Sequence, residues 1–407
     1  MQGINDSNTW WILAALILGL PLLMLLDGCR EPYEPDIVGF ADLLVVEGRL
    51  TNDTAGSVVL LSRSYGFELE KVIPVSGALV QFESASGTTY VLPELENGRY
   101  VSDPAVFDPV IGESYRLYVR TVDGKEYVSS YEEMKATPAI ESVDWQIGTK
   151  ERDVSGLIRD GVYITLNTRD PENNSRYYRW TWKEVWEFRV PFPIKGPWVW
   201  EPTPGVVPVA PGVSTEVCFR NESSTAFLLG TSRQLDDDVI VEFPLTFVDA
   251  RSGKLGYGYS IEVDQYTLSE EEYTFLQTLK KNTETTGSIF DPIPAEISGN
   301  IRNMADSTEV VIGYFGASTV TKDRIFIKRN EIDPPIVDVY IPFRACETMS
   351  LPLNLTELRT KLESGGLSFY DTIRDPFGNP VGFSIVASSC GDCRLSGSPD
   401  KPSFWPW

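Results

Sequence analysis

The segment SYRLYVRTVDGKEYVS, residues 114–129, indicates the fold of the first part of this chain. Its side chains Tyr115, Leu117 and Val119 alternate with polar or amphipathic neighbours, as expected for a β-strand with one buried face. Asp123-Gly124 then provides a tight turn, because glycine readily adopts the positive φ angle that such turns require. The segment therefore predicts a β-hairpin.

Similar strand and turn patterns precede this hairpin. The runs LLVVEGRL, SVVLLSRS and ALVQFES begin at Leu43, Ser57 and Ala78, and Asn97-Gly98 repeats the turn signal. Short strands with turns about every 8–12 residues are typical of a β-sandwich. We therefore predict a β-sandwich of immunoglobulin-like architecture over residues 41–137. The Cys-Trp-Cys pattern of antibody domains does not occur there, so the likeness is one of architecture.

A larger β-rich domain with one or two short helices is expected over residues 138–407. Pro138 marks its start, because a proline favours an extended conformation in the residue before it. The segment LSEEEY, residues 268–273, predicts one helix, since a serine followed three positions later by a glutamate forms a capping box. Its glutamates are accordingly interpreted as helix-stabilising groups. The second helix is expected to begin near Asn354 and to end at Gly365-Gly366.

An aromatic-rich stretch occupies residues 176–200. Tyr178, Trp180 and Trp182 fall on one face of a predicted strand, which favours a sandwich core over an exposed sugar-binding or docking surface. Trp198 and Trp200 lie instead in a segment rich in proline and glycine, residues 191–212. Aromatic side chains on such a loop are the better candidates for a contact surface.

The cysteines suggest an oxidising compartment. Besides Cys29 there are Cys218, Cys346, Cys390 and Cys393. Because the apolar segment at residues 10–26 predicts export, these four thiols indicate two disulfides. Three pairings are possible, of which we favour Cys390–Cys393 together with Cys218–Cys346. A four-cysteine zinc site is the alternative, but it is less favoured because there is only one CxxC motif and the other two cysteines are isolated.

The composition argues against several functions. The formal net charge of −23 disfavours nucleic-acid binding, which depends on lysine and arginine contacts to phosphates. The chain has no histidine, so Ser-His-Asp and Cys-His catalysis and most catalytic zinc sites are excluded. We expect no enzyme activity, no cofactor and no metal.

Carboxylates are the remaining route to catalysis or metal binding. A glycosidase needs two of them about 5–10 Å apart across a cleft, but with 58 acidic residues such pairs are unavoidable in sequence and uninformative. The run Asp236-Asp237-Asp238 is interpreted as a solvated turn. The turn at residues 169–174 has oxygen ligands for calcium but not the EF-hand spacing, which favours a solvated hairpin loop.

The N-terminus predicts export and lipidation. An apolar run from Trp10 to Leu26 leads into Asp27-Gly28-Cys29, which resembles a lipobox with Cys29 as the acylated residue. Residues 1–28 are then a signal peptide and residues 29–40 a proline-containing tether. The alternative is an uncleaved transmembrane anchor, because the run reaches the lower limit of about 17 residues and no Lys or Arg precedes it.

Several longer segments carry a family resemblance. They are LVVEGRLTN at residues 44–52, RYYRWTWKEVWEF at 176–188, VIGYFGAS at 311–318, and CGDCR followed by KPSFW near the end. In this order they resemble the lipoprotein family catalogued as domain of unknown function 4249, found in Bacteroidota. The resemblance implies an outer-membrane lipoprotein without an assigned activity, and an accessory role beside a TonB-dependent receptor in uptake.

Three hypotheses follow. The first is a lipid-anchored, non-catalytic accessory or binding protein of the outer membrane, facing either the periplasm or the cell surface. The second is a surface adhesin or carbohydrate-binding protein that uses its aromatic side chains. The third, which has the least support, is a carboxylate-based hydrolase.

Overall fold

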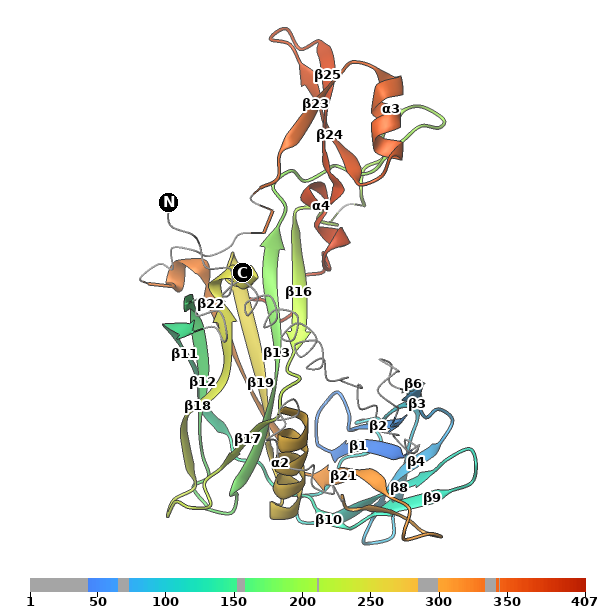
Figure 1. Cartoon of the computed structure of the whole chain (residues 1–407), viewed down its shortest axis with the longest axis vertical. Coiled ribbons are helices and arrows are strands. Elements are labelled where there is room, and N and C mark those ends of the chain that lie inside the picture. The colour runs from blue at the N-terminus through green and yellow to red at the C-terminus, as the bar shows by residue number, and fades with distance from the viewer. Residues whose placement is uncertain are drawn as a thin grey trace, which may run out of the picture.

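The computed structural model describes residues 43–64, 73–151, 158–210, 212–284, 299–333, 342–343 and 345–407. The predicted signal peptide, Cys29 and the tether lie outside these residues. The fold is mainly β, as predicted, and has three parts: an N-terminal sandwich, a central module of two sheets, and a C-terminal subdomain. Figure 1 shows the sandwich beside the lower end of the central module and the C-terminal subdomain at its upper end.

The sandwich consists of two sheets. The first, here called the cleft-side sheet, contains β1 (Leu44–Leu50), β2 (Val58–Arg63), β3 (Ile73–Pro74), β6 (Glu94–Glu96), β7 (Arg99–Val101) and β21 (Val311–Ala317). The second contains β4 (Leu79–Ser84), β5 (Thr89–Leu92), β8 (Ser114–Arg120), β9 (Glu126–Ser129), β10 (Glu132–Glu133) and β20 (Ile301–Asn303). Both predicted hairpins are present, with Gly98 and Gly124 at positive φ in the turns between β6 and β7 and between β8 and β9.

Two strands of the sandwich come from late in the chain. β21 pairs in parallel with β1, so that Leu44 lies opposite Val311, and β20 pairs antiparallel with β9. Figure 1 shows β21 in orange among the blue strands of the sandwich. Both strands lie within residues 138–407, which were expected to form the C-terminal domain. Local patterns show that a segment is a strand, but a pairing so distant in sequence has no turn to reveal it.

The central module is formed by two packed sheets. One contains β11 (Ile140–Glu151), β12 (Ile158–Arg169) and β18 (Val239–Asp249); the other contains β13 (Tyr177–Arg189), β16 (Val217–Ser223), β17 (Leu228–Thr231), β19 (Gly258–Thr267) and β22 (Val320–Lys328). Short 3-10 helices occupy Ala250–Ser252 and Arg329–Glu331. Tyr178 and Trp180 are fully buried in the core between the sheets, which confirms the core interpretation for these two aromatics.

Helix α2 (Glu270–Glu284) follows β19 and packs against the sandwich end of the central module. Ser269 caps it, accepting a hydrogen bond from the backbone N–H of Glu272 at 3.1 Å. Leu268 is buried before the first turn and Tyr273 packs in the same cluster. The predicted start of this helix is therefore confirmed.

The C-terminal subdomain surrounds a small apolar core. It contains β23 (Thr348–Pro352), β24 (Leu367–Arg374), β25 (Pro380–Ala387), α3 (Leu355–Glu363), α4 (Ser388–Gly391) and a 3-10 helix at Cys393–Leu395, with a short hairpin of β14 (Trp198–Val199) and β15 (Gly205–Val206) packed beside it. Asn354 caps α3, as predicted, by accepting hydrogen bonds from the N–H groups of Thr356 and Glu357. Within the part of the chain that the structure describes, no helix is long and apolar enough to cross a bilayer.

Candidate functional site

A cavity of about 390 Å³ separates the sandwich from the central module. One wall is the outer face of the cleft-side sheet, and the other is formed by β13, β19 and α2. In Figure 1, α2 lies beside β21 and β1 at this boundary. Small-molecule sites typically have volumes of roughly 300–1,000 Å³ and often lie between domains. We therefore take this inter-module cleft as the candidate site.

Strand β1 supplies much of the sandwich wall. Leu44 and Val46 alternate into the sandwich core, which directs Val45, Glu47 and Arg49 outward into the cleft. The outer face of an antiparallel sheet commonly contacts water. Here α2 and the central module cover it instead, so charged residues on β1 lie in a partly enclosed space.

Strand β13 forms the opposite wall by the same alternation. Tyr178 and Trp180 point into the core of the central module, whereas Arg179, Thr181 and Lys183 line the cleft. The aromatic face of this strand was predicted from the sequence, whereas its charged face was not recognised as part of a site. The arginine and lysine would be expected to contact solvent unless a second module covers them, and nothing local to β13 indicates that module.

A buried ion pair joins the two walls. Arg49 of β1 pairs with Glu272 of α2, and both side chains are largely buried. The guanidinium of Arg49 also lies 4.9 Å from the ring centroid of Tyr266 and 3.4 Å from the Ser318 hydroxyl. Burial raises the pKa of Glu272, and the positive charge of Arg49 opposes this shift. Glu272 therefore stabilises the contact between modules as well as belonging to the capping segment of α2.

Arg179 is a partly buried cation of the cleft with an incomplete set of partners. Its ion-pair partner is Glu47, whose carboxylate oxygen lies 3.8 Å from the Arg179 guanidinium and whose side chain is 68% exposed. Burial lowers the pKa of Arg179, and the nearby positive charge of Arg49 lowers it further. Among the described residues, no hydrogen bond to the Arg179 guanidinium is found. Arg179 is therefore a desolvated donor that faces the cavity.

A second charged cluster closes another side of the cleft. Lys322 Nζ lies 2.6 Å from an oxygen of Asp53 and 3.4 Å from Asp264 Oδ1, and Lys183 Nζ lies 3.6 Å from Asp264 Oδ2. Burial is the largest single influence on Asp53 and raises its pKa, but the hydrogen bonds from Lys322 and the Ala55 N–H and the charges of Lys322 and Lys183 together bring the pKa below its usual value. Burial raises the pKa of Asp264 despite the two lysines. Lysines therefore lie beside both carboxylates, but among the described residues Asp264 Oδ1 has no hydrogen-bond partner.

The remaining surface of the cleft is apolar. Phe275, Leu276 and Leu279 of α2 line it, together with Phe227 and Ile312. Apolar walls around a few fixed charges are the usual composition of a site for an amphipathic small molecule. The cleft can therefore bind and orient such a molecule. Among the described residues, no group of three histidine, cysteine, aspartate or glutamate side chains is arranged to hold a metal ion.

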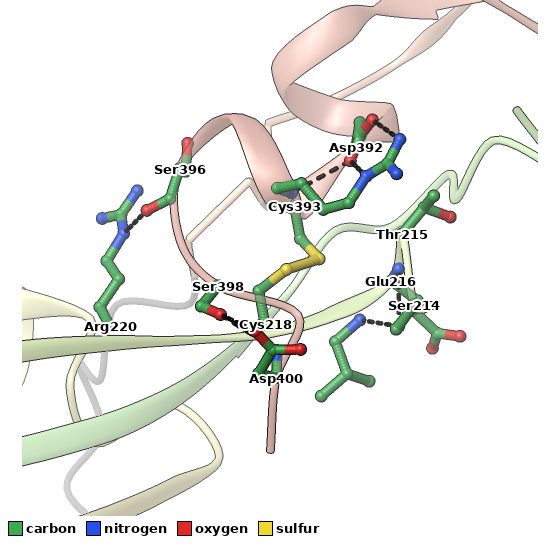
Figure 2. The surroundings of a disulfide bond; sticks show 12 residues. Ser214, Thr215, Glu216, Cys218, Arg220, Asp392, Cys393, Ser396, Ser398 and Asp400 are labelled. Carbon is green, nitrogen blue, oxygen red and sulfur yellow. Dashed lines mark hydrogen bonds and ion pairs between the residues drawn. A yellow bond between two sulfur atoms is a disulfide. The ribbon is translucent and has the colours of Figure 1, made fainter. Parts of the chain in front are cut away.

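The four cysteines form two disulfides, but not with the pairing we favoured. Cys218 pairs with Cys393, and Cys346 pairs with Cys390, with Cα–Cα distances of 5.6 and 5.9 Å. Figure 2 shows Cys218 on its strand joined to Cys393, beside Asp392 and Ser396. The short spacing of the CxxC motif suggested an internal bond. Instead the chain turns between α4 and the following 3-10 helix, and the two cysteines reach different partners.

Trp198 and Trp200 are both half-buried beside the core of the C-terminal subdomain. The ring centroid of Trp198 lies 4.6 Å from that of Phe369, and the guanidinium of Arg359 lies 5.4 Å from the ring centroid of Trp200. These tryptophans lie away from the inter-module cleft, whose lining does not include them. Their role as a contact surface stays a prediction.

The acidic run was only partly interpreted correctly. Asp236 and Asp237 are exposed, but Asp238 is buried and accepts hydrogen bonds from the Tyr178 hydroxyl at 2.7 Å and from Ser232. In the turn at residues 169–174, Asp170 accepts hydrogen bonds from the N–H groups of Glu172 and Asn174. Both aspartates thus have local structural partners.

Comparison with known protein families gives one informative result. The family model described as Domain of unknown function (DUF4249) matches residues 30–324. The matched part contains every residue that lines the cleft, from Val45 to Tyr314. It ends before β23, so the CGDCR and KPSFW segments lie outside it. No curated protein matches the chain.

Proposed function

The chain belongs to the DUF4249 family, and we propose that it is a non-catalytic binding protein that takes a small ligand into the inter-module cleft. The observation that carries this proposal is the cavity of about 390 Å³ with a desolvated Arg179 and apolar walls. The carboxylates of Asp53, Asp264 and Glu272 around the cavity each have a cationic partner within the protein. These acids therefore do not need a ligand to balance their charge.

The test is ligand-dependent stabilisation of the mature protein. A molecule that binds the native state raises the unfolding temperature in proportion to its concentration relative to Kd. We would screen small molecules by thermal unfolding and repeat each hit on Thr181→Trp, which fills the cleft from β13. Thr88→Trp, on an exposed turn of the sandwich, is the matched control. Hits that stabilise Thr181→Trp as strongly as the wild type would contradict binding in the cleft.

We further propose that the protein is anchored by lipid on Cys29 at the outer membrane. The apolar run before Asp27-Gly28-Cys29 supports this, as do two disulfides, which persist in oxidising compartments. Cys29→Ala should release the protein from the membrane fraction. If the variant remains there, the segment from Trp10 to Leu26 is a transmembrane anchor and the lipoprotein proposal is wrong.

An accessory role beside a TonB-dependent receptor rests on the family resemblance alone. Crosslinking in intact cells followed by affinity purification should recover an outer-membrane receptor with the protein. Recovery of the protein alone under all growth conditions would count against this role.

The alternative is a carbohydrate-binding or adhesive protein that uses Trp198 and Trp200. Its support is that Trp200 is only half-buried and lies beside the cation of Arg359. A glycan array that shows binding by the wild type and none by Trp200→Ala would favour it over the cleft. An array without any signal would remove its basis.

A further inference from the structure

We infer that the cleft recognises the carboxylate of a small amphipathic organic acid, with Arg179 as the residue that binds the anion. This inference rests on the proposed binding function and adds the chemical class of the ligand. It follows from the incomplete partners of Arg179, the charge balance of the cleft, and the position of its apolar lining.

The guanidinium of Arg179 lacks hydrogen-bond partners among the described residues. Its side chain is 21% exposed and therefore partly buried. A guanidinium that is partly removed from water is normally compensated by hydrogen bonds. The contact with Glu47 at 3.8 Å is too long for a hydrogen bond. A ligand carboxylate could instead accept two parallel N–H donations from the guanidinium fork.

Arg49 is not equivalent to Arg179, although both line the cleft. Arg49 is already held by Glu272, by the Tyr266 ring and by Ser318. Glu272 pairs directly with Arg49, whereas Arg179 has only the longer contact with Glu47 and the more distant charge of Glu272. We expect Glu47 to act as an internal competitor that the ligand carboxylate displaces toward solvent.

The charges of the cleft lining are balanced. The described lining contains four cationic residues, Arg49, Arg99, Arg179 and Lys183, and four anionic residues, Glu47, Asp53, Asp264 and Glu272. This contrasts with the formal net charge of −23 for the whole chain. The cleft is therefore less repulsive to a small anion than the average charge of the chain implies.

The apolar lining sets the rest of the ligand. Phe275, Leu276 and Leu279 extend along α2 from the turn that carries Glu272, and Phe227 and Ile312 line the same cavity. A ligand whose carboxylate contacts Arg179 can therefore place an apolar body against α2. Burial of that body would contribute roughly 25 cal/mol per Å² of apolar surface, which makes an alkyl or aryl acid preferable to a fully polar one.

The experiment compares octanoate with octanol and inorganic phosphate in titration calorimetry of the full mature chain. Octanol keeps the alkyl chain without the charge, and phosphate keeps an anion without the alkyl chain. We expect octanoate to bind and both comparison compounds to bind at least about 10-fold more weakly, as befits the loss of a charge-assisted hydrogen-bond pair. Octanol binding as tightly as octanoate would overturn the carboxylate inference, while the proposed binding function would survive.

Variants assign the anion contact. Arg179→Gln should weaken octanoate binding about 10–100-fold, whereas Arg120→Gln, an exposed arginine on β8, should leave it unchanged. Glu47→Gln should tighten binding, because it removes the competing carboxylate. That gain is not expected if Arg179 is merely structural, and it stays measurable if Arg179→Gln does not fold.

The outcomes separate the two proposals. If Glu47→Gln leaves octanoate affinity unchanged, or if phosphate competes with octanoate equally well, the inference about Arg179 and carboxylates is wrong. If no compound of the panel or the wider screen binds, and Thr181→Trp changes nothing, the proposed function itself fails.

Discussion

The sandwich and the C-terminal subdomain are both attached to the central module, but through different interactions. At the sandwich, the chain passes from β21 to β22 through buried Ser318 and Thr319. Thr137 donates two hydrogen bonds to Thr319, from its N–H to the hydroxyl at 2.8 Å and from its hydroxyl to the backbone carbonyl at 2.6 Å. The ion pair of Arg49 and Glu272 joins the same two parts. At the C-terminal subdomain, the Cys218–Cys393 disulfide ties the end of the chain to β16, and Trp405 packs against Phe219.

The difference follows from the size of the cores. The sandwich core contains many fully buried side chains from both of its sheets. The C-terminal subdomain has fewer buried side chains, in two small clusters that include Leu358, Phe369, Phe383 and Ile385 in one and Val386 and Cys390 in the other. A small apolar core rarely stabilises a fold alone, and disulfides commonly compensate in exported proteins. The cleft is thus built from the sandwich and the central module, which have the larger cores, and all of its lining residues lie within the family match.

The largest effect is expected from breaking the ion pair between modules. Arg49→Ala leaves the carboxylate of Glu272 buried without its partner, and loss of one member of a buried pair costs about 3–5 kcal/mol. Urea unfolding should show this loss. Arg49→Met combined with Glu272→Leu should recover most of it, because neither charge then remains buried. A loss below about 1 kcal/mol for Arg49→Ala would show that backbone pairing alone holds the sandwich in place.

The disulfide between Cys346 and Cys390 should matter only for the C-terminal subdomain. Replacing both cysteines by serine should cost about 2–4 kcal/mol. Hydrogen exchange should then speed up in β23 and β25 and stay unchanged in β1 and β2. Equal acceleration in the sandwich would contradict the distinction between the two attachments.

Helix capping offers a matched comparison of the two regions. Asn354 caps α3 in the C-terminal subdomain, and Ser269 caps α2 at the sandwich boundary. Alanine at either position should cost about 1 kcal/mol. We expect Asn354→Ala to increase proteolysis within the C-terminal subdomain and Ser269→Ala to act on the cooperative unfolding of the larger part. Identical proteolysis patterns would mean that the two regions unfold as one unit.

The smallest effect should come from pH. The folded-state pKa of Asp264 is raised above its ordinary value of 3.8, mainly by burial. An acid with a raised pKa in the folded state contributes stability that is present below its unfolded pKa and is lost as pH rises through the folded pKa. Asp264→Asn should therefore gain stability relative to the wild type as pH increases, as measured by urea unfolding across a pH series. A gain on lowering the pH would reverse this assignment.

Features that depend on neighbouring residues were predicted correctly. Gly98, Gly124 and the caps at Ser269 and Asn354 occur where local patterns place them, because turns and helix ends are decided within a few residues. The buried face of β13 also followed from its alternation.

Features decided by distant contacts were not predicted. The pairing of β1 with β21, the partners of the cysteines and the pair of Arg49 with Glu272 each join segments far apart in sequence. The cleft belongs to this class. Arg179 alternates with core aromatics, as a solvent-facing residue would, and only the arrangement of the two modules encloses it.

The parallel pairing of β1 with β21 constrains the order in which the protein can fold as the chain is made. The sandwich lacks β20 and β21 until residue 317 has been synthesised, by which point the strands from β11 to β19 already exist. During that interval the edge of β1 that later binds β21 has unpaired backbone groups, which are a template for aggregation. Newly made chains should accordingly depend on chaperones, and chains truncated before residue 301 should depend on them permanently.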